Sequence, residues 1–347
     1  MRSTSIKVSA SFLGTAALLL CVLMPGCGQA QNASTYTQAL AAFNAHNFQV
    51  AASLFAKAEA ANPGQSDALL FEGKALANLG RFPAAEQPLR QYSTAHPDSA
   101  DALYMLGFVL NREDKPKESL EVYNRAARLS VPQSDDLKSV ALDYVLLNDY
   151  PDAIRWMKQS LQFNPRNQQA WYALGRCYYT QSSFPQAQQA FDRALALDPN
   201  DLKAATNLAL TLEMLNQPAK ADGAYRHAIA LADSDPHTDQ WPYLDYGSFL
   251  LEQGRAQDAI PLLTRSIAIA PTCAQCHGKL GRAYDETGKF EQAVAELEHA
   301  VTLSPHDAKL HYALGHAYRS AGLIEKSREE LALSAKLYGT KDATGPK

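Results

Sequence analysis

Residues 171–199 read WYALGRCYYTQSSFPQAQQAFDRALALDP, and the spacing within this stretch decides the fold. Small and apolar residues recur there in two runs, Trp171, Leu174, Gly175 and Tyr178, then Ala187, Phe191 and Ala194. Each run has the period of a helix with one apolar face. A short polar segment separates the runs, and Pro199 follows the second. The stretch therefore predicts two short helices joined by a turn.

The pattern W-x2-L-G-x2-Y, A-x3-F, P resembles the tetratricopeptide repeat family, whose unit of 34 residues is a helix–turn–helix. With Trp171 at position 4, steps of 34 residues extend the pattern along nearly the whole chain. The starts are Asn32, Ser66, Ala100, Ser134, Gln168, Leu202, Gln240, Ala274 and Ala308. We expect six repeats over 32–235, an insertion at 236–239, three repeats over 240–341 and a polar tail at 342–347.

Two positions of the repeat must be small because two helices cross there. Position 8 reads Ala39, Gly73, Gly107, Ala141, Gly175, Ala209, Gly247, Gly281 and Gly315. Position 20 reads Ala51, Ala85, Ser119, Ala153, Ala187, Ala221, Ala259, Ala293 and Ser327. No bulky residue occurs in either set, so the periodicity is not accidental.

Position 15 is predicted to end the first helix of each repeat in the left-handed conformation. It reads His46, Gly80, Asp114, Asn148, Ser182, Asn216, Gly254, Gly288 and Gly322, mostly residues that tolerate this geometry. Proline at position 32 closes most second helices. The resemblance implies an all-α, right-handed superhelix of about nine stacked repeats, whose first helices line a concave surface. Stacking buries the apolar face that one helix pair cannot bury alone.

The first 30 residues have the composition of a signal peptide. A basic start precedes an apolar run over 12–24, which is too short to be interpreted first as a membrane-spanning helix. Residues 28–30 offer a small-x-small cleavage site. Residues 24–27 resemble a bacterial lipobox that would lipidate Cys27, and an uncleaved anchor is a third alternative. We expect an exported protein, either periplasmic or held at the membrane only through a lipid.

Cys273, Cys276 and His277 form C-x-x-C-H, the attachment signature of c-type haem. His277 also falls at repeat position 4, as His311 does in the next repeat, and Cys276 falls at position 3, where four other repeats have alanine. The motif is therefore also explained by ordinary repeat residues, with a local disulfide or free thiols. Zinc lacks an evident fourth ligand. We expect no haem, no other cofactor and no metal.

The concave surface is the other candidate site. In this family first-helix positions 2, 5, 9, 12 and 13 tend to face it. In the middle repeats these and position 6 carry Tyr104, Phe108, Asn111, Arg112, Tyr172, Arg176, Tyr179 and Asn207. Aromatic residues and arginine are enriched at binding hot spots. Alternatively, some of these rings pack between repeats, or the binding surface lies around Arg282, His316 and Arg319.

The net charge of −4 over 347 residues argues against nucleic acid as a partner. The sequence contains no phosphate loop, dinucleotide fingerprint, H-E-x-x-H or G-x-S-x-G motif, and no catalytic residue can be proposed. We therefore expect a non-enzymatic scaffold of the cell envelope that binds a peptide or protein partner in the groove. The alternative is a haem-bearing or redox-active repeat protein that uses Cys273, Cys276 and His277.

Overall fold

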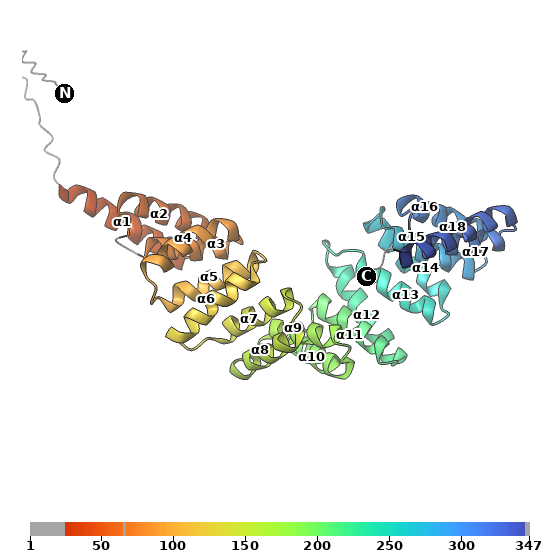
Figure 1. Cartoon of the computed structure of the whole chain (residues 1–347), viewed down its shortest axis with the longest axis horizontal. Coiled ribbons are helices and arrows are strands. Elements are labelled where there is room, and N and C mark those ends of the chain that lie inside the picture. The colour runs from red at the N-terminus through yellow and green to blue at the C-terminus, as the bar shows by residue number, and fades with distance from the viewer. Residues whose placement is uncertain (1–24, 65–66, 344–347) are drawn as a thin grey trace, which may run out of the picture. The chain divides into compact units, whose positions relative to one another are not determined.

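The computed structural model describes residues 25–64 and 67–343, and the regular structure of these residues is entirely helical, which confirms the predicted all-α fold. The chain divides into two compact units, 1–113 and 114–347, and each is described by itself (Figure 1). The first unit contains α1 (Pro25–Asn44), α2 (Phe48–Ala61), α3 (Ala68–Asn78), α4 (Phe82–Ala95) and α5 (Ala100–Arg112).

The second unit contains thirteen further helices, which run in sequence order. They are α6 (Pro116–Leu129), α7 (Ser134–Leu146), α8 (Tyr150–Phe163), α9 (Gln168–Thr180), α10 (Phe184–Leu197), α11 (Leu202–Met214), α12 (Pro218–Ser234), α13 (Trp241–Glu252), α14 (Ala256–Ile269), α15 (Ala274–Glu286), α16 (Phe290–Leu303), α17 (Ala308–Ser320) and α18 (Ile324–Ala343).

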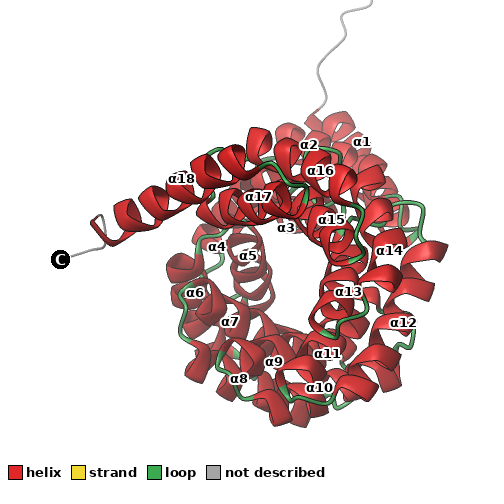
Figure 2. Ribbon diagram, turned by 90° about the vertical axis from the view of Figure 1, so that its right-hand side faces the viewer, coloured by secondary structure: helices red, strands yellow, loops and turns green. Residues whose placement is uncertain are grey.

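The helices of the second unit form two layers. Consecutive helices pack on one another, and α7, α9, α11, α13, α15 and α17 each also contact the next member of that series. Figure 2 shows α7, α9, α11 and α13 on the inner side and α8, α10, α12 and α14 on the outer side. The first helices of the second unit, from α7 to α17, thus form one continuous face.

The close crossing of the two helices in each repeat explains the small residue at position 8. At Gly281, a Cβ atom would lie 2.6 Å from Cγ of Leu297 and 3.1 Å from the backbone oxygen of Ala293. Leu297 is buried on α16 in the same repeat. The large side chain at position 24 therefore occupies the volume that glycine leaves open on the facing helix.

The turn after each first helix has the same geometry throughout. All nine residues at position 15 have a positive φ, between 53° and 77°. In the fifth repeat, Ser183 N–H donates to the Tyr178 carbonyl oxygen at 2.8 Å and Ser182 N–H donates to the Tyr179 carbonyl oxygen at 2.9 Å. This is the Schellman pattern, which satisfies the last carbonyl groups of a helix. The left-handed turn predicted at position 15 is confirmed.

Two glycine-to-alanine substitutions test the crossing. Gly281→Ala should lower the free energy of unfolding by about 1–3 kcal/mol, because the new methyl group meets a buried side chain and a backbone atom. Gly223→Ala, on an exposed part of α12 where a Cβ meets nothing within 4 Å, should instead raise it by up to about 1 kcal/mol. Urea unfolding followed by circular dichroism measures both. Equal effects of the two substitutions would contradict the packing argument.

Candidate functional site

The structure brings three of the predicted groove residues together on the first-helix face of the second unit. Tyr172 and Arg176 lie one turn apart on α9, and Asn207 lies on α11. Arg176 and Asn207 lie near enough to the Tyr172 hydroxyl to lower its pKa, and Asn207 Nδ2 donates to the Lys203 carbonyl oxygen at 2.8 Å. The Tyr172 ring lies 6.0 Å from the ring of Phe191, between their centroids, so one side of it packs on the core. Burial raises the pKa of Tyr172, and Arg176 partly opposes that shift.

Tyr179 continues this face toward the end of α9. Its ring packs edge-on against Phe184 at 5.5 Å, which fits the inter-helix packing alternative for part of this side chain. Burial raises the pKa of its hydroxyl, and the carboxylates of Glu213 and Asp245 raise it further. Tyr179 is therefore half-buried at the edge of an acidic group of residues.

Sequence reasoning missed that acidic group, which we define as Glu213 on α11, Tyr225 on α12 and Asp245 on α13. Tyr225 donates a hydrogen bond to Glu213 Oε2 at 2.8 Å. The pKa of Asp245 is raised to about 6, chiefly by burial and then by the negative charges of Glu213 and Asp239. No cation contributes to the shift. The sequence signal that could have revealed this group is the pair formed by Asp245, at position 6 of the seventh repeat, and Glu213, at position 12 of the sixth repeat.

The other predicted groove residues lie on α5 in the first unit. The Phe108 ring packs edge-on against Phe82 at 5.9 Å, and the Arg112 guanidinium lies 5.1 Å from the centroid of the same ring. Tyr104 is half-buried. Asn111 is only 6% exposed, which differs from the exposed position predicted for it, and it continues a buried stretch of α5 that includes Val109 and Leu110.

The two cysteines of the C-x-x-C-H motif form a disulfide with each other. Cys276 is fully buried and Cys273 is half-buried. His277 Nδ1 lies 2.6 Å from Glu296 Oε2, and His277 Nε2 lies 3.0 Å from the Pro271 carbonyl oxygen. Haem attachment needs both sulfur atoms free and one ring nitrogen open to the iron, so these residues do not fit a c-type haem.

The next repeat shows that the histidine geometry does not depend on the cysteines. His311 Nδ1 lies 2.6 Å from Glu330 Oε2, and His311 Nε2 lies 3.0 Å from the Pro305 carbonyl oxygen. The predicted equivalence of His277 and His311 as ordinary repeat residues therefore extends to their hydrogen-bond partners. Among the described residues no cluster of at least three His, Cys, Asp or Glu side chains could hold a metal ion.

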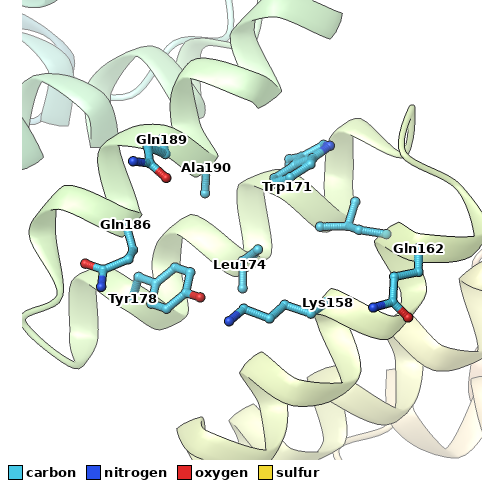
Figure 3. A pocket seen from close by; sticks show the side chains of 9 residues that line it. Lys158, Gln162, Trp171, Leu174, Tyr178, Gln186, Gln189 and Ala190 are labelled. Atoms are coloured by element: carbon cyan, nitrogen blue, oxygen red, sulfur yellow. The ribbon is translucent and has the colours of Figure 1, made fainter.

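A cavity of about 540 Å³ opens between α8 and α10, with α9 beneath it (Figure 3). Lys158, Leu161, Gln162, Trp171, Leu174, Tyr178, Gln186, Gln189 and Ala190 line it. Trp171 Nε1 donates to the carbonyl oxygen of Pro165, six residues earlier, at 2.9 Å. His277 and His311 contact the carbonyl oxygens of Pro271 and Pro305, which also lie six residues before them. The small Ala190 stands where those later repeats have Glu296 and Glu330, which leaves space beneath the indole ring.

A second cavity, of about 380 Å³, lies on the first-helix face at α15 and α17. Arg282, Asp285, Glu286, Leu297, Tyr312, Ala313 and His316 line it. Arg282 forms ion pairs with Glu286 at 2.7 Å and Glu252 at 2.9 Å. The rings of Tyr312 and His316 lie 4.5 Å apart, and Arg319 Nη2 lies 2.8 Å from His316 Nδ1. This cavity coincides with the alternative binding surface considered from sequence.

Two expectations about the membrane concern the N-terminal region. Residues 1–24, which hold the apolar run, lie outside the described part of the chain. Cys27 falls within α1, but its side chain is also outside the description. Within residues 25–64 and 67–343, no helix is long and apolar enough to span a bilayer.

The acidic group generates a pH-dependence prediction. Because the pKa of Asp245 is raised to about 6 from the usual ~3.9 of an unfolded chain, ionising Asp245 costs stability as pH rises. Asp245→Asn should therefore raise the free energy of unfolding by on the order of 1–2 kcal/mol at pH 7.5, and the gain should vanish below about pH 4.

Urea unfolding across this pH range measures the effect. Glu325→Gln is the control, because Glu325 is exposed and pairs only with the exposed Arg328, so the change should stay within about 0.5 kcal/mol. A gain for Asp245→Asn that is the same at pH 4 as at pH 7.5 would show that the charge is not its cause.

Tetratricopeptide repeat families match most of the chain. The family described as the TPR domain of cytochrome c-type biogenesis protein H matches residues 148–267. Other tetratricopeptide families match residues 36–97 and 72–133, 250–301 and 281–322.

Curated proteins match part of the chain. BBSome complex member BBS4 of Xenopus tropicalis is 30% identical over 105 residues, which are 30% of this chain and 20% of that protein. The Bos taurus BBS4 is 28% identical over 171 residues, which are 49% of this chain and 32% of that protein. The matched region is thus at most about a third of the length of these relatives.

Solved structures resemble the fold. The pilF structure of Pseudomonas aeruginosa gives a TM-score of 0.52 at 20% identity and covers 60% of this chain and 94% of that chain. A chain of the APC/C hetero-tetramer Cut9–Hcn1 gives 0.51 at 18% identity and covers 81% of this chain and 56% of that chain. The repeat positions, the helix pairs and the matched families agree, and the chain belongs to the tetratricopeptide repeat family.

Proposed function

We propose that this protein is a non-enzymatic scaffold that binds an extended segment of a partner protein along the first-helix face of its second unit. The observation that carries the proposal is the group formed by Tyr172, Arg176 and Asn207, in which an aromatic ring, a guanidinium and an amide from two consecutive first helices lie together. Arg176 is exposed and Tyr172 is half-buried. Such a group offers contact area together with hydrogen-bond donors.

Two further features support this proposal. Tetratricopeptide repeat scaffolds are generally non-enzymatic and bind protein partners. The cavity at Tyr312 and His316 lies on the same layer of first helices, at α15 and α17. A segment that extended along this layer from α9 would meet polar and aromatic side chains at both places.

We also propose that the protein acts in the cell envelope after export. The support is the basic start and the apolar run at residues 12–24, followed by a small-x-small site at 28–30. Cys27 in the lipobox-like residues 24–27 would add a lipid anchor, and this anchor would be the route by which the protein meets a membrane.

A charge reversal on α9 tests the binding face. Arg176→Glu should reduce partner capture at least about tenfold, since truncation of an interface hot spot costs roughly 2 kcal/mol or more. Its melting temperature should change little, because Arg176 is exposed. Tyr172→Phe, which keeps the ring against Phe191 but removes the hydroxyl, should give a smaller loss. The measurement is quantitative pull-down from crosslinked native cells.

The matched control is Arg193→Glu, because Arg193 is also an exposed arginine but lies on the second helix α10. It should retain full capture. If Arg176→Glu stays folded and captures the same partners as strongly as Arg193→Glu, the binding face is not at α9.

Export is tested separately by mass spectrometry of the protein purified from its native host. We expect a mature N-terminus at a lipidated Cys27 or at Gln31. An intact Met1 in the native host would contradict the export proposal and would leave the binding proposal unaffected.

A further inference from the structure

We propose that the Cys273–Cys276 disulfide is a thiol–disulfide exchange centre whose substrate is a dithiol or disulfide of another protein. This activity goes beyond the scaffold function, and it uses a part of the fold that the proposed binding face does not include. The pair lies where the turn after α14 enters α15.

The first argument is that repeat packing does not explain Cys273. Position 3 is small in other repeats, so Cys276 can replace an alanine such as Ala102. Cys273, however, is the N-cap of α15, where its Sγ accepts a hydrogen bond from Cys276 N–H at 3.1 Å, whereas four other first helices have an oxygen acceptor at this place. Those N-caps are Ser99, Asn167, Asp201 and Asp307, and each accepts a backbone hydrogen bond. Cysteine is not among the preferred N-cap residues.

The second argument is the difference in access to the two sulfur atoms. Cys276 is fully buried, whereas Cys273 is half-buried at the end of a turn. Cys273 is therefore the more accessible residue of the pair, and a partner's sulfur would meet it before Cys276. This division into an accessible sulfur and a buried sulfur gives the exchange reaction a single entry point.

The third argument is the environment of the buried sulfur. The Ser266 hydroxyl donates a hydrogen bond to Cys276 Sγ at 3.1 Å, and Ser266 is itself fully buried. Both cysteines lie at the N-terminus of a helix of 13 residues, where negative charge is favoured. The fold thus offers a donor and a helix dipole to the sulfur that leaves when the disulfide opens.

The reaction is a thiol–disulfide exchange in two steps. A thiolate of a partner dithiol attacks Cys273 Sγ, the Cys273–Cys276 bond breaks, and Cys276 leaves as a thiolate. The partner's second thiolate then attacks the partner sulfur of this mixed disulfide and releases the Cys273 thiolate. The partner dithiol is oxidised to a disulfide, and its two electrons reside on the reduced cysteine pair. The same steps in reverse let the reduced pair reduce a partner disulfide.

His277 is not the base in this scheme. Both of its ring nitrogens lie within hydrogen-bonding distance of oxygen atoms of Glu296 and Pro271, and its ring stacks on that of His299 with 4.3 Å between centroids. The remaining described thiol is not a competitor either. Burial raises the pKa of the Cys177 thiol to about 11, so it remains protonated and unreactive.

The experiment mixes the full-length oxidised protein with a reduced synthetic peptide that contains two cysteines. We expect about one peptide disulfide to form for each protein molecule. Cys276→Ala, which leaves the accessible sulfur, should instead accumulate a mixed disulfide with a peptide that carries a single cysteine as an activated disulfide, because this peptide has no second thiolate to release it. Peptide mapping should place the mixed disulfide on Cys273. Cys273→Ser, which leaves the buried sulfur, should react at least about tenfold more slowly.

The double variant Cys273→Ser/Cys276→Ala is the matched control, because it reproduces the N-cap serine and the alanine that begin α5, Ser99 and Ala102. It should keep the helical circular dichroism and lose the reaction. Reduction of the wild-type pair only under conditions that also unfold the protein would show a purely structural crosslink and would overturn the proposal. So would a mixed disulfide mapped to another cysteine. Neither result affects partner capture through Arg176, which is measured independently.

Discussion

The close approach of the two helices within each repeat is the contact on which the rest of the structure depends. A residue without a large side chain at position 8, such as Gly281, lets the facing Leu297 fill the crossing. This crossing buries one side of the first helix. Residues three positions before it and one position after it, such as Tyr172 and Arg176 around Gly175, are then free to form a surface, and the same spacing repeats on each first helix.

The sequence was sufficient to predict the fold because the decisive signals are local. A left-handed residue at position 15 and a small residue at position 8 are backbone constraints, and each acts within its own repeat. The meeting of Tyr172 with Asn207 was predictable in the same way, because both are set by repeat position. Asn111 was not predictable, because its burial depends on how much apolar surface α5 carries.

Electrostatic features were harder to predict, because they depend on how deeply the fold buries a charged group. The raised pKa of Asp245 depends on burial and on Glu213, which belongs to the previous repeat. The C-x-x-C-H motif shows the opposite difficulty. Its spacing suggests haem attachment, but His277 makes the same hydrogen-bond contacts as His311, which has no cysteine beside it. The cysteine at the N-cap of α15, Cys273, is what distinguishes the motif from an ordinary repeat.

A repeat array can carry two functions with little interference. Its stability is approximately a sum of terms within repeats and between neighbouring repeats. The disulfide lies at the start of α15, which packs on α14, whereas Arg176 belongs to α9, which packs on α7, α8, α10 and α11. Because the layer of first helices is continuous from α7 to α17, a partner held at α9 can still extend toward α15. The scaffold would then present a partner's sulfur to Cys273 without either site having to change its own fold.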